Sequence, residues 1–83
     1  MDCSQFFIPA DSHPILSVRE NREIFTLHFG SGPLLPLRHD EARALLAALE
    51  TGVFAVCGQD LTASQARQLI EALQVHFFPK YSN

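Results

Sequence analysis

Several residue types are scarce in this 83-residue chain. It has no tryptophan, one tyrosine, two cysteines, and only six lysine and arginine residues together. Two cysteines are too few for a disulfide framework, and Cys3 and Cys57 lack the spacing of a zinc site. We therefore expect both thiols to be reduced, as in a cytoplasmic protein.

Charge and hydropathy argue against two classes of partner, nucleic acids and membranes. The formal net charge is -3, and the few basic residues are scattered, whereas binding to phosphates requires clustered lysine and arginine. No stretch reaches the ~18 to 20 apolar residues that span a bilayer. The first residues carry Asp2 and no basic region, and their short apolar run stops at Pro9, so we expect no signal peptide. We expect a cytoplasmic protein without a membrane partner, and the charge argues against a nucleic-acid partner.

A change of hydrophobic period divides the chain. Between residues 15 and 37 apolar residues alternate, which is the strand period. A tight turn with Asn21 at positive φ would place Val18 opposite Phe25, and Leu16 opposite Leu27, on one face. These residues predict the first hairpin of a β-meander.

The second connection of the meander contains Gly30, Gly32 and Pro33. A three-residue loop there would pair Phe29 with Leu35 and keep the apolar face intact, whereas a two-residue loop would split that face. The same register pairs Leu27 with Leu37. Pro36 cannot donate a ladder hydrogen bond, so the third strand belongs at a sheet edge.

After residue 37 the apolar residues recur every three to four positions, which predicts helices over 39–51 and 62–77. Arg38 is a poor N-cap for the first helix, whereas Thr62 and Gln65 form a capping box for the second. The short apolar segment 53–57 suits a fourth strand, with a turn of helix as the alternative.

The predicted fold is a single α+β domain over 1–83, with an arm (1–14), a meander (15–37) and a tail (79–83). Its sheet is small, antiparallel and three- to four-stranded, with two amphipathic helices packed on one face. The face that we expect the helices to cover consists of Leu16, Val18, Phe25, Leu27, Phe29, Leu35 and Leu37.

Catalytic patterns are weak. Ser31 lies between two glycines but in a hairpin, not on the strand-to-helix turn that exposes a nucleophile. The histidines show no helical i, i+4 pair of the kind that binds zinc; they are His13, His28, His39 and His76. We predict no enzyme activity, cofactor or catalytic residue. A metal site assembled in space from His28 and Cys57 is the alternative.

Several features exceed what a small core needs and predict a surface for a protein partner. They are an outer sheet face left uncovered, acidic residues at the hairpin tip and at the start of the first helix, and aromatic residues near the end of the chain. Two alternatives compete: residues 6–8 cover the outer face, or the chain bends at Pro79 and buries its aromatic rings. The predicted partner-binding residues are Ile24, His28, Glu20, Glu23, Asp40, Glu41, Phe78 and Tyr81.

These features favour a non-catalytic protein-binding module that acts as a small regulator, adaptor or inhibitor of a larger assembly. Inhibition of a bacterial defence complex by a phage or mobile-element protein is one niche for chains of this size. A homodimer through the small residues Ala44 and Ala47 of the first helix is a further expectation. The alternative function is a nucleic-acid-binding transcriptional regulator that reads bases with the second helix, through Ser64, Gln65, Arg67 and Gln68.

Overall fold

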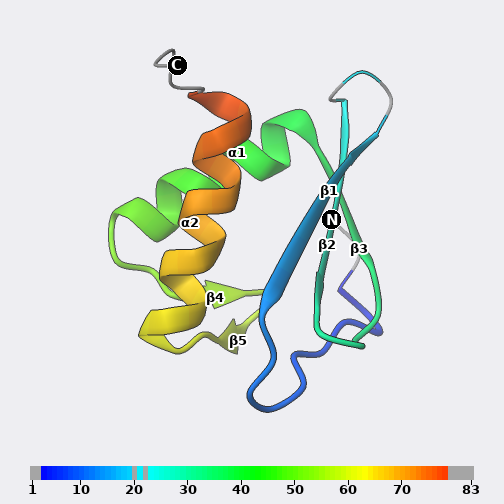
Figure 1. Ribbon diagram of the computed structural model, residues 1–83, viewed down its shortest axis with the longest axis vertical. Coiled ribbons are helices and arrows are strands. Elements are labelled where there is room, and N and C mark those ends of the chain that lie inside the picture. The colour runs from blue at the N-terminus through cyan, green and yellow to red at the C-terminus, as the bar shows by residue number, and fades with distance from the viewer. Residues whose placement is uncertain (1–2, 20, 22, 79–83) are drawn as a thin grey trace.

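The computed structural model describes residues 3–19, 21 and 23–78. The fold is α+β, with a three-stranded antiparallel sheet in the order β1-β2-β3, a separate two-stranded sheet and two helices. Figure 1 shows both helices to the left of the three-stranded sheet, which is seen from its β1 edge. The elements in chain order are β1 (Pro14–Arg19), β2 (Ile24–Phe29), β3 (Leu35–Arg38), α1 (His39–Glu50), β4 (Ala55–Val56), β5 (Gln59–Asp60) and α2 (Ala63–Phe77).

The first hairpin confirms the register expected from the alternation. Val18 pairs with Phe25, and Leu16 pairs with Leu27. Asn21 has φ of 55°, the left-handed conformation that a tight hairpin turn requires. Residues 20 and 22 of this turn lie outside the described residues.

The second hairpin corrects the expected register by two residues. Leu27 pairs with Leu35 and Phe25 with Leu37, so neither expected pairing forms. A turn closes earlier than expected, through a 2.9 Å hydrogen bond from the Gly32 N–H to the Phe29 oxygen. Because side chains alternate with period two, an even shift keeps every apolar residue on its original face.

The segment after α1 does not extend the meander. β4 pairs with β5 in a hairpin of its own, so the expected fourth strand does not join the three-stranded sheet. Cys57 and Gly58 form the turn, with φ of 54° and 77°. Positive φ at both central residues is the requirement of a type I′ hairpin turn. Cys57 stands where this turn usually has asparagine, aspartate or glycine, so the sequence carries no typical hairpin signal here.

Helices and sheet share one hydrophobic core. α1 ends at Glu50, followed by Gly52 at φ of 99°, and α2 begins after Thr62. The core contains apolar residues of the three-stranded sheet, of both helices, of the N-terminal arm and of the β4–β5 region. The buried members are Phe6, Phe25, Leu27, Phe29, Leu35, Leu37, Ala42, Leu45, Leu46, Leu49, Val56, Leu61, Ala66, Leu69 and Leu73.

The N-terminal arm (residues 3–13) packs against the core. The Phe6 ring lies edge-on to Phe29 at 6.1 Å, and Cys3 forms a disulfide with Cys57. The expectation of reduced thiols is therefore wrong. Gln59 holds the arm between these contacts: its Nε2 donates to the Phe6 oxygen at 2.7 Å, and its Oε1 accepts from the Ile8 N–H at 3.2 Å. Phe6 thus lies in the core and not over the outer sheet face.

Candidate partner-binding surface

An open pocket of about 520 Å³ lies where the start of β2 meets the start of α1. Ile24 begins β2 and pairs with Arg38, the last residue of β3, from which α1 continues directly. This connection brings three of the predicted partner-binding residues together. The pocket is lined by Glu23, Ile24, Arg38, His39 and Asp40.

His39 anchors this pocket to the core. Its N–H donates a 3.1 Å hydrogen bond to the Glu23 oxygen, and its ring meets Phe77 edge-on at 4.9 Å. Phe77 stacks on the buried Phe25 at 5.3 Å, and Phe25 also contacts the ring of His76 at 5.8 Å. The end of α2 and the start of α1 are therefore held together by aromatic contacts.

The start of α1 is capped from inside the helix. Arg38 has the extended backbone of an N-cap residue, and its guanidinium offers no acceptor for the first N–H groups. Instead the Glu41 carboxylate accepts the Arg38 N–H at 2.8 Å, and the Asp40 carboxylate accepts the Glu41 N–H at 2.9 Å. The bond from the Arg38 N–H is the main cause that lowers the pKa of Glu41 from 4.5. Glu41 thus caps the helix, while Asp40 remains exposed.

The remaining predicted residues are distributed differently. His28 lies at the far end of β2, opposite Ile15, and its Nδ1 donates to the Gly30 oxygen at 2.8 Å. The structure therefore does not bring His28 to the pocket. Glu20 and Tyr81 fall outside the described residues.

Phe78 is the next residue after Phe77, whose ring contacts His39 of the pocket. It follows Phe77 at the end of α2, donates its N–H to the Gln74 oxygen at 2.7 Å, and is 57% exposed. Val75, one turn earlier, is 65% exposed. Phe78 is therefore not buried against the domain, contrary to the alternative of a ring folded inward after the helix.

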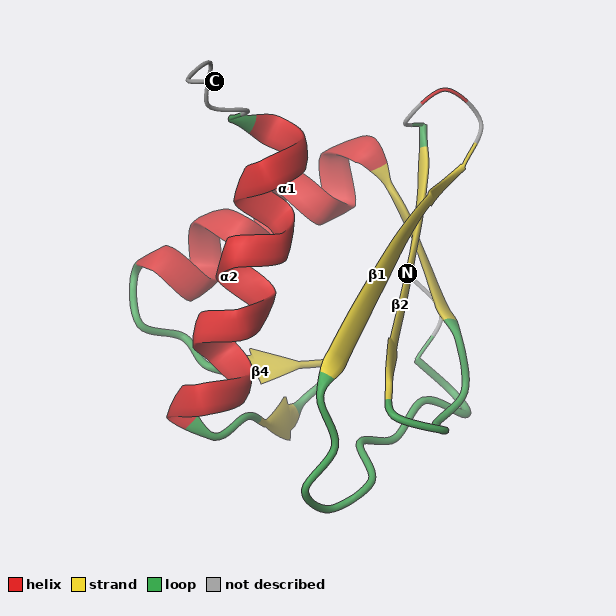
Figure 2. Ribbon diagram, in the orientation of Figure 1, coloured by secondary structure: helices red, strands yellow, loops and turns green. Residues whose placement is uncertain are grey.

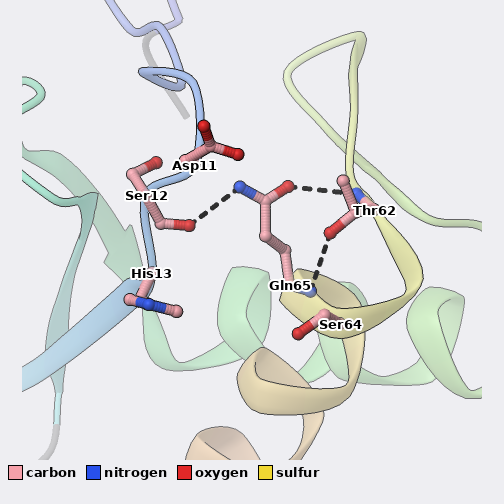
Figure 3. Close-up of a pocket in the computed structure, with 6 residues that line it drawn as sticks. All are labelled: Asp11, Ser12, His13, Thr62, Ser64 and Gln65. Atoms are coloured by element: carbon pink, nitrogen blue, oxygen red, sulfur yellow. Dashed lines mark hydrogen bonds between the residues drawn. The ribbon is translucent and has the colours of Figure 1, made fainter.

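A second pocket, of about 340 Å³, lies between the N-terminal arm and the first turn of α2 (Figure 3). The expected capping box is confirmed: Thr62 Oγ1 accepts the Gln65 N–H at 3.1 Å, and Gln65 Oε1 accepts the Thr62 N–H at 3.0 Å. Gln65 is 7% exposed, and its Nε2 donates to the Ser12 oxygen at 2.9 Å. The lining residues are Asp11, Ser12, His13, Thr62, Ser64 and Gln65.

Most of the side chains proposed to contact nucleic-acid bases make contacts within the protein at or near this second pocket. Gln65 is buried against the arm, and Oε1 of Gln68 lies 3.1 Å from Nδ1 of His13. The Gln68 amide also donates to the Ser64 hydroxyl at 3.1 Å. Of the four residues proposed to contact nucleic acid, only Arg67 has none of these contacts. The geometry thus gives α2 a structural role at its N-terminus.

The disulfide bears on the alternative of a metal site assembled from His28 and Cys57. In the described part of the chain, no three histidine, cysteine or acidic side chains gather closely enough to hold a metal ion. Cys57 is bonded to Cys3, so its sulfur is not available as the thiolate ligand that a site with His28 would need.

Sequence reasoning missed two residues of the first pocket, Arg38 and His39. The signal was present in the pairing of strands, since the correct register places Arg38 directly opposite Ile24. The expected register, displaced by two residues, carries Arg38 away from Ile24.

Comparison of the chain with protein-family models, curated proteins and solved structures gave no match. Within the described residues, neither helix has the length and apolar character needed to cross a bilayer.

Proposed function

We propose that this chain is a non-catalytic protein-binding module, a small regulator, adaptor or inhibitor of a larger protein assembly. The observation that carries the proposal is the pocket that brings Glu23, Ile24 and Asp40 together. In this proposal both helices cover the same face of the three-stranded sheet. The opposite face, from which Ile24 and Arg38 project, is then open to the partner.

The chemistry of the pocket supports a polypeptide as partner. Its lining residues carry both signs of charge: Glu23 and Asp40 are negative, and Arg38 is positive. Two carboxylates would repel the phosphates of a nucleic acid, whereas a protein surface offers charges of both signs. Ile24 adds an apolar contact, and Phe78, beside Phe77, offers the kind of aromatic anchor that dominates many interfaces.

Affinity capture with matched variants tests the proposal. The tagged chain is compared with Phe78→Ala and Ile24→Ser, and with Val53→Ala, a control that removes an exposed apolar side chain from the loop after α1. We expect a stoichiometric protein partner whose affinity falls at least about tenfold in the first two variants. The control should bind as the wild type does. Absence of a stoichiometric partner, or equal binding by all variants, would refute the proposal.

The place of action and the biological niche remain predictions. The disulfide counts against a cytoplasmic location, because thiols of cytoplasmic proteins are kept reduced. Inhibition of a bacterial defence complex rests on the size of the chain, and no residue of the pocket points to that target.

A further inference from the structure

The two edges of the three-stranded sheet differ in what they offer to another strand. The Gly30 N–H donates to the His13 oxygen at 3.0 Å, and the His39 N–H donates to the Glu23 oxygen at 3.1 Å. In an antiparallel ladder, hydrogen-bonded pairs alternate with non-bonded ones. These two bonds therefore fix which backbone groups of each edge strand point outward.

The β3 edge is closed to strand addition. Its outward-pointing residues are Pro36 and Arg38, because Leu35 and Leu37 bond to β2. Pro36 has no N–H, and the N–H of Arg38 is occupied by the Glu41 carboxylate. This edge has the protection that natural sheets use against unwanted pairing.

Among the described residues, no strand pairs with the outer edge of β1. The alternation directs Ile15, Ser17 and Arg19 toward β2, so that the N–H and oxygen of Leu16 and Val18 point outward. β1 is the end strand of the sheet, and Figure 2 shows no other ribbon in front of it. β1 thus presents a row of donors and acceptors that the other edge lacks.

We propose that a second copy of this chain pairs antiparallel with β1, with Ser17 on the two-fold axis. Leu16 of each copy then faces Val18 of the other, and each such pair exchanges both of its backbone hydrogen bonds. This inference goes beyond the protein-binding function and uses none of the pocket residues.

The strand is complementary to itself in this register. On the core side Leu16 meets Val18, both apolar, and on the outer side Arg19 meets Ile15, so no like charges face each other. When the two β1 strands pair through their outward-pointing N–H and oxygen groups, the core faces of the two sheets lie on the same side of the joined sheet. Both copies therefore place their α2 helices on the same side of the joined sheet.

The flank of α2 beside β1 suits this arrangement. The contact between His13 and Gln68 places Gln68 on the side of the helix that faces the start of β1. Ala72 and Val75 follow Gln68 on the same side, at helical spacing. Val75 is 65% exposed, and the exposed Glu71, one turn before Val75, borders this flank. The small Ala72 and the exposed Val75 give the α2 helices of two copies an uncharged point of contact.

Charge substitution at Ser17 tests the pairing. Ser17 is exposed on the outer side of β1, so Ser17→Lys changes no core contact but places two lysines opposite each other on the axis. Sedimentation of the full chain at micromolar to millimolar concentrations measures the dimer. We expect dimer affinity to fall at least about fivefold in Ser17→Lys and in Ser17→Glu. An equal mixture of the two variants should restore association as a heterodimer.

Ser31→Lys adds the same charge in the β2–β3 connection and is the matched control, which should dimerise like the wild type. Circular dichroism verifies that every variant is folded. A wild type that stays monomeric throughout, a dimer unaffected by Ser17→Lys, or a mixture that fails to associate would each overturn the proposal. So would a monomer whose β1 edge binds an extended segment of another protein.

Discussion

The amide of Gln65 joins two segments that lie far apart in the chain: its Nε2 donates a 2.9 Å hydrogen bond to the Ser12 oxygen, 53 residues earlier. The same side chain caps α2 through its Oε1. One buried residue thus fixes both the start of a helix and the position of the N-terminal arm.

Replacing Gln65 with alanine should therefore be costly. Gln65→Ala removes one half of the capping box and leaves the Ser12 oxygen without its partner, which together should lower the free energy of unfolding by about 2 kcal/mol. Urea denaturation measures the change. Ser64→Ala, one residue earlier on the exposed side of the helix, is the control and should stay close to the wild type. Equal stability of the two variants would show that neither the capping bond nor the Ser12 bond of Gln65 contributes.

Reduction of the Cys3–Cys57 disulfide should destabilise the fold. The bond joins residues 54 positions apart, so reduction restores considerable freedom to the unfolded chain. We expect a loss of about 2–4 kcal/mol, measured by urea denaturation with and without a reductant. Cys3→Ser should show the same loss and no further response to reductant. A wild type whose stability does not respond to reductant, although mass spectrometry detects the bond, would contradict this expectation.

Gly32 should not accept a side chain. A Cβ atom there would lie 3.0 Å from the backbone oxygens of Phe29 and Phe7 and from Cδ of Pro9. Two of these atoms belong to backbone, so relief requires movement of the arm or the turn. Gly32→Ala should lower the free energy of unfolding by about 1–3 kcal/mol, as overpacking does in cores. Ser31→Ala, in the same turn but exposed, should be nearly neutral in the same denaturation assay.

Glu41 should make stability depend on pH under acidic conditions. The pKa of its carboxyl in the folded state lies below 4.5, so its contribution is complete above that value and is lost as the pH falls through the lowered pKa. Glu41→Gln keeps an acceptor for the Arg38 N–H but does not titrate. The wild type should therefore lose more stability than the variant between about pH 7 and about pH 3, as measured by urea midpoints. Parallel losses in both proteins would be inconsistent with this role.

Local patterns predicted the parts of the fold that depend on neighbouring residues. The alternation around Asn21 defined the first hairpin, and Thr62 with Gln65 defined the start of α2. The second register was wrong because its turn depends on the arm, whose Phe7 oxygen closely approaches Gly32. No local pattern reports a contact between segments so distant in the chain.

The candidate site was partly predictable for the same reason. Glu23, Ile24 and Asp40 stood out as residues beyond the needs of the core, but their common pocket follows from the pairing of Ile24 with Arg38. The disulfide was missed because its two cysteines meet only after the arm has packed beside the β4–β5 turn. The positions of the two cysteines in the sequence therefore do not predict the disulfide.

Pro36 has a consequence for the size of any assembly. A sheet with free backbone N–H donors at both edges continues to add strands, and such growth leads to fibres. Here the β3 edge contains Pro36, which has no backbone N–H to donate. If two copies pair through β1 as proposed, both outer edges of the joined three-stranded sheets are β3 edges, so growth through these sheets stops at a pair.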